Sequence, residues 1–311
     1  MKVVVTGGAG FIGANLCETL LRTDGVTEVV AFDDLSTGFK ENLDGLDVEL
    51  VEATILDPDA LDETFAGAAS IVHLGARGSV PLSVDNPWAS HEANATGTIR
   101  VLEAARKAGD VQVIVASSSS VYGANRELPK RETMVPRPVS PYAATKLATE
   151  SYAIAWQHTY GLPTLAFRFF NVFGPKQSTT HVYAAVTPRF VSAALAGEPL
   201  PVHGDGTQSR DFTYVGTVAE VIATAVVEQV SHEIPVNLAF GTRTSLLEVI
   251  SIMEEILGHP LGRDHQPRRA GDVDHTQADN SLLRSLFPDV QPVSLAEGLQ
   301  RTIDWYRTAL G

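Results

Sequence analysis

The sequence contains a single cysteine, Cys17, among 311 residues. An intrachain disulfide needs two cysteines, so none can form, and a chain without disulfides fits a reducing compartment. No apolar run approaches the roughly 18 residues that a membrane-spanning helix needs, and the N-terminus lacks the basic and then apolar segments of a signal peptide. We therefore expect a cytoplasmic protein with no membrane partner.

Cationic residues are also scarce. The chain has 23 Lys and Arg against 37 Asp and Glu, a net charge of −14. This balance argues against a nucleic-acid surface, which would have to neutralise phosphates. It leaves room for a small anionic ligand, because charges beyond roughly 8 Å are screened and a local arginine cluster can dominate. We expect no nucleic-acid partner and no metal site.

Proline-rich or glycine-rich linkers and internal repeats are absent as well, which suggests one large domain or two modest ones. Short apolar runs alternate with helical patterns, the order typical of a doubly wound parallel α/β sheet. The expected strands are Val3–Thr6, Val29–Phe32, Val48–Glu52, Ile71–Leu74, Val111–Ala116, Thr164–Phe169 and Pro235–Ala239. The expected helices include Pro87–Ala108, Tyr142–Thr159, Val215–Val230 and Leu295–Ala309.

A glycine-rich turn follows the first expected strand. Gly7, Gly10 and Gly13 stand three residues apart, and a helical pattern begins at once. Such glycines let the backbone approach a pyrophosphate, and the helix N-terminus supplies N–H groups and positive dipole. Asp33 ends the second strand twenty positions beyond Gly13, where a carboxylate can meet ribose hydroxyls and repel a 2′-phosphate. The pattern predicts a Rossmann-type NAD site rather than an NADP site.

Tyr142 and Lys146 are four residues apart and would share one face of a helix. A free phenol titrates near pH ~10, and a neighbouring cation favours the phenolate. We expect Lys146 to lower the pKa of Tyr142, so that the phenol can take a proton from a hydroxyl group. Tyr-x-x-x-Lys alone occurs often by chance, and the glycine loop makes the pair informative.

Six features follow one another along the chain: the glycine loop, Asp33, Ser117–Gly123, the Tyr142/Lys146 pair, Arg168–Gly174 and Gly204–Asp211. In this order they resemble the extended short-chain dehydrogenase/reductases. More narrowly, the chain is similar to the NAD-dependent nucleotide-sugar 4-epimerases of the UDP-glucose 4-epimerase type, from Met1 to roughly Asp279.

This resemblance implies site residues. Tyr142, Lys146 and Ser118 would be catalytic, and Phe170 would match an aromatic residue that faces the nicotinamide. The implied NAD contacts are Gly7, Gly10, Phe11, Ile12, Gly13, Asp33, Asp34, Thr37, Gly38, Thr54, Ile55, Leu74, Ala76, Arg77, Asn94, Tyr142, Lys146 and Phe169. The implied UDP-sugar contacts are Ser118, Ser119, Ser120, Tyr142, Asn171, Val186, His203, Arg210, Arg269, Asp272 and Thr276.

The substrate contacts have distinct implied roles. Asn171, Arg210 and Arg269 match residues that hold the diphosphate, and Asp272 matches a ribose contact. His203 stands where an aromatic residue usually stacks on uracil; the alternative is an ordinary surface histidine with no role in binding.

The resemblance also implies a domain division. Residues 1–170, together with about 212–240, would form the NAD-binding domain, and 171–211 with 241–311 would form a smaller, mixed α/β domain that binds the nucleotide sugar.

The implied reaction is inversion at C4 through a transient 4-keto sugar. Ser119 and Ser120 replace the acidic residues of related dehydratases, which argues against dehydration. Thr276, a small residue beside C2, favours UDP-glucose/UDP-galactose with tolerance of N-acetylhexosamines. Three successive hydroxyls from Ser118 suggest a UDP-glucuronate 4-epimerase as the alternative, and a nucleotide-sugar oxidoreductase is a further one. The intact Ser118, Tyr142 and Lys146 set argues against a regulator that only binds NAD.

The resemblance also implies a homodimer. Helices around Asn94–Ala108 and Tyr142–Thr159 would form its interface.

Overall fold

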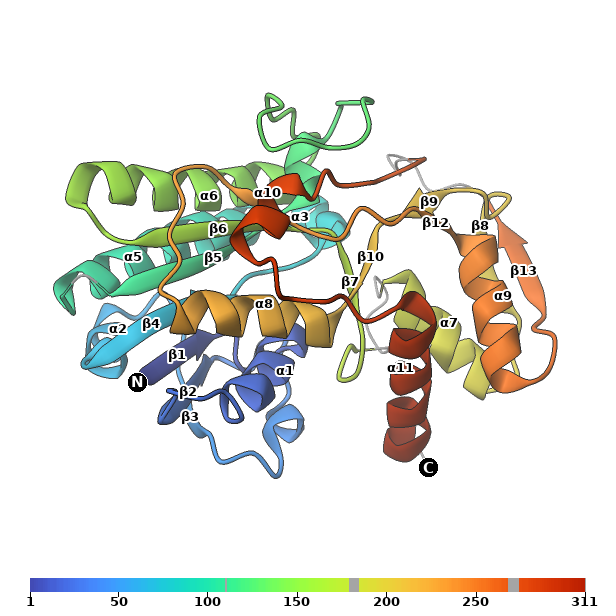
Figure 1. Cartoon of the computed structure of the whole chain (residues 1–311), viewed down its shortest axis with the longest axis horizontal. Coiled ribbons are helices and arrows are strands. Elements are labelled where there is room, and N and C mark those ends of the chain that lie inside the picture. Colours follow the sequence, from blue (N-terminus) through green and yellow to red (C-terminus); the bar gives the residue numbers. More distant parts are fainter. Residues whose placement is uncertain (110, 179–184, 268–273, 311) are drawn as a thin grey trace.

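A parallel sheet forms the centre of the molecule (Figure 1). The structure, a computed structural model, describes residues 1–109, 111–178, 185–267 and 274–310. Within these ranges the sheet has seven strands in the order β11-β6-β5-β4-β1-β2-β3. Their bounds are β1 (Lys2–Thr6), β2 (Glu28–Asp33), β3 (Glu49–Glu52), β4 (Ala68–His73), β5 (Gln112–Ser118), β6 (Thr164–Phe169) and β11 (Val236–Leu238). Each overlaps a predicted strand, so the predicted sheet is confirmed.

Helices cover both faces of this sheet. Because side chains alternate along a strand, Val3 and Val5 of β1 enter one core while Val4 enters the other. The first core is closed by α1 (Phe11–Leu20), α8 (Val215–Val227) and the segment around α10 (Ser281–Leu286). The second is closed by α2 (Pro58–Phe65), α5 (Gly97–Lys107) and α6 (Pro141–Tyr160). The fold is therefore doubly wound, as the alternation of strands and helices predicts.

The helix expected over Pro87–Ala108 is interrupted. It consists of α4 (Pro87–His91), a π-helical turn (Glu92–Thr96) and α5. Asn94, inside that turn, is almost fully buried, and its side-chain amide bonds Arg77 and Thr145 instead of pointing to solvent. Wider turns of this kind commonly mark functional sites in helices, and apolar periodicity does not reveal them.

Shorter elements follow β6. Three two-stranded sheets pair β7 (Asn171–Phe173) with β10 (Phe212–Tyr214), β9 (Ser209–Arg210) with β12 (Thr244–Ser245), and β8 (Leu200–His203) with β13 (Arg263–Gln266). With α7 (Val186–Leu195), α9 (Leu246–Leu257) and α11 (Leu295–Leu310) they surround a third core. These elements lie on the right of Figure 1. The separate core is compatible with the predicted domains, whose boundaries stay a prediction.

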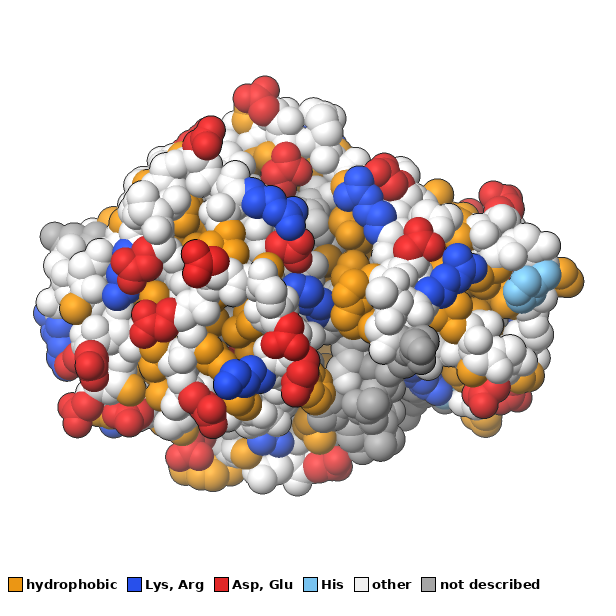
Figure 2. Space-filling view, turned by 90° about the horizontal axis from the view of Figure 1, so that it is seen from below, with side chains coloured by type: hydrophobic (Ala, Val, Ile, Leu, Met, Phe, Trp, Pro, Cys, Tyr) orange, Lys and Arg blue, Asp and Glu red, His pale blue; other side chains and the backbone are white. Residues whose placement is uncertain are grey.

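Three short elements lie in the connections between these strands and helices. A 3₁₀ turn (Lys40–Leu43) follows β2, the helix α3 (Val80–Asp85) precedes α4, and another 3₁₀ turn (Ser119–Tyr122) follows β5. In the view of Figure 2, acidic and basic side chains are interspersed and form no single basic patch. Among the described residues, no helix combines the length and apolarity needed to cross a membrane.

Candidate active site

A cleft of about 690 Å³ lies at the carboxyl ends of β1, β2, β4 and β5. Small-molecule sites commonly have volumes of roughly 300 to 1,000 Å³ and occupy this edge of parallel sheets. Most of the predicted cofactor residues line it. They are Gly7, Gly10, Phe11, Ile12, Gly13, Asp33, Asp34, Thr37, Thr54, Ile55, Leu74, Ala76, Arg77, Tyr142, Lys146 and Phe169.

The glycine loop forms one wall of this cleft. Gly7 has a φ of +71°, and a Cβ added to Gly13 would lie 2.1 Å from the Gly7 carbonyl oxygen, so only glycine allows this close turn. Gly10 precedes α1, whose first turn has no side-chain cap and no acidic residue. The N-terminal N–H groups therefore remain available to a pyrophosphate, and this cradle fits a dinucleotide.

Asp33 forms the next wall. Its carboxylate is buried and accepts hydrogen bonds from the N–H of Ala9 (3.0 Å) and of Leu35 (2.9 Å). Burial raises its pKa, and these bonds oppose the rise. Gly38 does not line the cleft but packs against the carboxylate, where an added Cβ would lie 3.0 Å from both oxygens. The fixed carboxylate suits ribose hydroxyls and would repel a 2′-phosphate.

The three predicted catalytic side chains all line the same cleft. Ser118 ends β5, and Tyr142 and Lys146 stand on the first two turns of α6. Ser140 caps this helix at the N–H of Ala143. Lys146 Nζ donates to the Ala116 carbonyl at 2.8 Å, and burial lowers the pKa of the ammonium to about 8. Helix α6 and strand β5 thus bring together the phenol, the ammonium and the hydroxyl.

The expected electrostatics of Tyr142 is wrong in one respect. Its pKa is raised, because burial disfavours the phenolate, although hydrogen bonding with Ser118 lowers it in part. The prediction took the charge of the neighbouring Lys146 as decisive. In the folded chain the Lys146 ammonium donates to the Ala116 carbonyl, and burial of the phenol sets the direction of the pKa shift.

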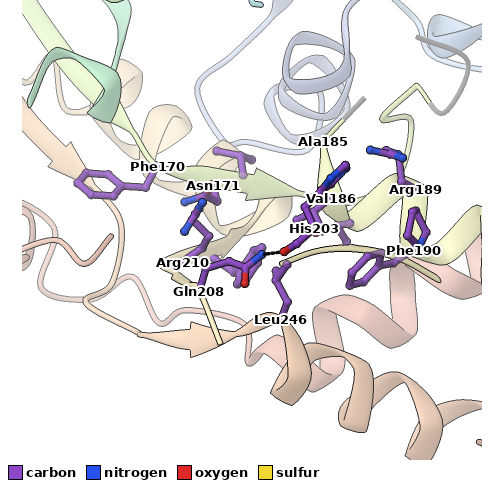
Figure 3. Close-up of a pocket in the computed structure, with 14 residues that line it drawn as sticks. Phe170, Asn171, Ala185, Val186, Arg189, Phe190, His203, Gln208, Arg210 and Leu246 are labelled. Atoms are coloured by element: carbon purple, nitrogen blue, oxygen red, sulfur yellow. Dashed lines mark hydrogen bonds between the residues drawn. The ribbon is translucent and has the colours of Figure 1, made fainter. Parts of the chain in front are cut away.

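A second cleft of about 350 Å³ adjoins the first (Figure 3). Phe170, Val172 and Ala185 line both clefts. Four predicted substrate residues line the second one: Asn171, Val186, His203 and Arg210.

Main-chain contacts hold two of these side chains. His203 Nδ1 lies 3.1 Å from the Pro267 carbonyl oxygen, and Arg210 Nη1 donates to the carbonyls of Ser209 (3.0 Å) and Asp274 (3.2 Å). The amide of Gln208 donates to the His203 carbonyl at 2.6 Å, the bond drawn in Figure 3. The smaller cleft, which continues into the larger one, is thus lined by the imidazole of His203 and by two guanidinium groups, of Arg189 and Arg210.

Several predicted residues line neither cleft. Ser119 and Ser120 lie in the turn after β5, where the Ser120 hydroxyl is buried without a hydrogen-bond partner among the described residues. Thr276 Oγ1 accepts from Asn171 Nδ2 at 3.4 Å, so Thr276 contacts a residue that lines the smaller cleft but does not line it itself. Asn94 supports the backbone of Arg77. Arg269 and Asp272 lie outside the described residues.

Sequence reasoning missed further lining residues. In the larger cleft they include Gly75, Gly78, Ser79, Leu82 and Ser178, and in the smaller one Phe190, Pro201, Gln208, Phe212 and Leu246. Gln208 stands inside the run Gly204–Asp211 and was detectable there, whereas the others come from loops, helices and short strands and belong to no motif. In the described part of the chain, no three His, Cys, Asp or Glu side chains are grouped to hold a metal ion.

Comparison with known proteins agrees with this geometry. Residues 3–239 match the model of the NAD dependent epimerase/dehydratase family. A UDP-glucose 4-epimerase from Mycolicibacterium smegmatis is 36% identical over 313 residues, 99% of each chain.

Two solved structures are also similar. A UDP-N-acetylglucosamine 4-epimerase from Methanobrevibacter ruminantium M1, in complex with UDP-N-acetylmuramic acid, is 33% identical, with a TM-score of 0.93 over 99% of this chain and 98% of that one. A UDP-glucuronic acid 4-epimerase from Bacillus cereus, with UDP-glucuronic acid and NAD, is 30% identical, with a TM-score of 0.88 over 99% and 100%. With its dinucleotide cradle and its Ser118, Tyr142 and Lys146 set, the chain belongs to the NAD dependent epimerase/dehydratase family.

Proposed function

We propose that this protein is a UDP-sugar 4-epimerase that inverts C4 of UDP-glucose or UDP-galactose and also accepts UDP-N-acetylhexosamines. One observation carries the proposal. Ser118, Tyr142 and Lys146 face the same cleft as the glycine loop and Asp33, and this cleft continues into the one that holds Arg210. A proton-transfer group therefore lies between a dinucleotide cradle and a cationic pocket.

The chain's own residues move the proton. Tyr142, as phenolate, takes the proton of the O4 hydroxyl, while Ser118 hydrogen-bonds the same oxygen and, by its hydrogen bond with Tyr142, opposes the rise that burial causes in the pKa of the phenol. The Lys146 ammonium in the same cleft would lie near the ribose of NAD. NAD, held by the glycine loop and Asp33, would supply the hydride acceptor and donor for C4, so that the sugar would pass through a ketone at C4. Tyr142 then gives the proton back to O4. Return of the hydride to the other face of C4 would give inversion with no net oxidation.

Inversion requires that the nucleotide stays fixed while the hexose turns. Arg210, with Arg269 as predicted, would hold the diphosphate through charge-assisted bonds, which are about twice as strong as neutral ones. The wall between the two clefts is formed by Phe170, Val172 and Ala185, which offer the sugar no charge. An apolar surface of this kind lets the ring turn without breaking ionic contacts.

Position 276 and the serines after β5 bear on the choice of sugar. Thr276 lies beside Asn171 and lines neither cleft, so the proposed tolerance of a C2 N-acetyl group rests on the resemblance and on the small size of this side chain. The UDP-glucuronate alternative has less support, because Ser119 and Ser120 do not line the cleft where they would meet a C6 carboxylate.

Product analysis with UDP-glucose, UDP-N-acetylglucosamine and UDP-glucuronate in parallel tests the proposal. We expect UDP-galactose as the fastest product and measurable epimerisation of the N-acetylated sugar. Faster conversion of UDP-glucuronate would establish the alternative. Accumulation of NADH in step with substrate consumption would replace both by a net oxidoreductase.

We also propose a homodimer through α4, α5 and α6. Large side chains are exposed on these elements: Trp88 at 72% and Tyr160 at 50%. Buried against a second copy, they would contribute apolar area that a monomer leaves in water. Light scattering of the purified protein should give twice the mass of 33.2 kDa. A mass of one chain at micromolar concentration would contradict this interface.

A further inference from the structure

A chain of buried polar side chains runs from the cofactor cradle toward α6. Thr6 Oγ1 lies 2.7 Å from His73 Nδ1 and accepts from the N–H of Gly75 at 3.2 Å. His73 Nε2 lies 3.2 Å from Thr98 Oγ1. Thr6 and Thr98 are fully buried, and His73 is 3% exposed. Such groups are costly to bury unless every donor and acceptor is matched.

Only one direction satisfies every bond in this chain. Thr98 Oγ1 donates its proton to the Asn94 carbonyl at 2.5 Å, so toward His73 it can only accept, and His73 must carry its proton on Nε2. Nδ1 of His73 then accepts the proton of Thr6 Oγ1, which itself accepts from the N–H of Gly75. A protonated imidazole would leave the Thr6 hydroxyl without its acceptor. Burial accordingly lowers the pKa of His73 to about 3, with the Lys146 charge adding to the effect.

Asn94 extends the chain to both sides of the cleft. Its Oδ1 accepts from the Arg77 N–H at 2.8 Å, and its Nδ2 donates to Thr145 Oγ1 at 2.9 Å. Thr145 Oγ1 donates to the carbonyl of Tyr142 at 2.8 Å. The same amide therefore holds a segment that lines the cofactor cleft and the helical turn that carries the phenol.

We propose that His73 is a positioning residue that fixes the separation between the cofactor cradle and the catalytic phenol of α6. At one end it holds Thr6, the last residue before the glycine loop. At the other end it orients Thr98 and, through Asn94 and Thr145, the turn of Tyr142. Errors of about 1 Å in the placement of reacting groups can lower the rate a hundredfold. A buried residue that fixes this placement therefore affects the chemical step without contacting a ligand.

Side-chain replacements along the chain separate positioning from packing. Thr98→Val removes one hydroxyl at nearly constant shape. Thr217→Val is the matched control, because Thr217 is equally buried and its hydroxyl, among the described residues, accepts one hydrogen bond, from the remote Val293 N–H at 3.0 Å. His73→Leu breaks both ends, whereas His73→Gln restores one acceptor and one donor. Each variant is assayed for melting temperature and, by calorimetry, for NAD affinity. Its kcat and KM are measured with the UDP-sugar that the wild-type protein converts fastest in the product analysis.

We expect Thr98→Val to lower kcat about tenfold with KM within about twofold, since one buried hydrogen bond is worth roughly that factor. His73→Leu should weaken NAD binding about tenfold as well, and His73→Gln should recover most of both losses. Thr217→Val should lower the melting temperature as much as Thr98→Val and leave kcat and NAD affinity unchanged.

Other results would overturn the proposal. If Thr98→Val and His73→Leu keep wild-type kcat and NAD affinity, or if Thr217→Val reduces them equally, the buried hydrogen bonds of His73 only stabilise the fold. Should His73→Leu fail to fold, Thr98→Val and His73→Gln decide. The kcat measurement rests on the proposed epimerase function, whereas NAD affinity does not. If the wild-type protein converts no UDP-sugar, the proposed function fails. The positioning role of His73 is then tested by NAD affinity alone, and unchanged NAD affinity in the variants would reject it.

Discussion

The two clefts are built in different ways. The larger one is formed by residues at the ends of central strands, where Thr6, Asp33 and Ser117 are buried within the sheet. The smaller one lies among two-stranded sheets of short strands, and its half-buried His203 and Arg210 contact main-chain carbonyls of neighbouring loops and strands. A rigid wall suits a cofactor that stays bound through the reaction, and an adjustable wall suits a substrate that enters, turns and leaves.

The largest expected effect separates chemistry from binding in the larger cleft. Tyr142→Phe removes the phenolic proton carrier and keeps the ring, so kcat should fall about a thousandfold while NAD affinity stays within about twofold. The measurements are steady-state turnover and calorimetric NAD titration. Turnover within about tenfold of wild type would show that another group moves the proton.

A clash in the rigid wall should have the next largest effect. Gly13→Ala places a Cβ 2.1 Å from the Gly7 carbonyl oxygen, so the loop must shift. We expect NAD affinity to fall about a hundredfold, because the backbone can no longer approach the pyrophosphate closely. Gly262→Ala is the control, since its Cβ would meet only Pro199 at an ordinary 3.5 Å. Equal losses in both variants would refute a specific role of the loop.

The same contrast explains what the sequence reveals. The strands of the sheet and the glycine loop were predictable because buried strands give continuous apolar runs and a close turn demands glycine at fixed positions. The short strands around the smaller cleft have two to four residues, too few for a periodicity. The raised pKa of Tyr142 was not predictable, because spacing along a helix shows that two groups are neighbours but not how far burial removes them from water.

The adjustable wall should respond in affinity rather than in chemistry. Arg210→Gln removes the charge that would hold the diphosphate, so KM should rise roughly thirtyfold, the loss of one charge-assisted bond, while kcat changes less than about threefold. NAD affinity should not change. Substrate titration gives the separation of KM from kcat. A fall in kcat with unchanged KM would contradict the clamp.

The smallest effect concerns stability. The pKa of Lys146 is lowered from 10.5 to about 8 by burial, so between these values the unfolded chain binds more protons than the folded one. Wild-type stability from this group therefore rises with pH across that window. Lys146→Met lacks the buried charge, and its stability relative to wild type should be highest below pH about 8 and decline above it. Urea unfolding at several pH values measures the difference in unfolding free energy between Lys146→Met and wild type. An advantage of the variant that grows with pH would contradict the lowered pKa of Lys146.

The fate of the hydrogen at C4 tests the central claim most directly. The converted UDP-sugar is supplied with deuterium at C4, and the products are examined by mass spectrometry and NMR. We expect the inverted sugar to keep its deuterium at C4, with no label in water and no free NADH, because the hydride is removed and returned within one cleft. Loss of the label to solvent, or its recovery in released NADH, would contradict the account.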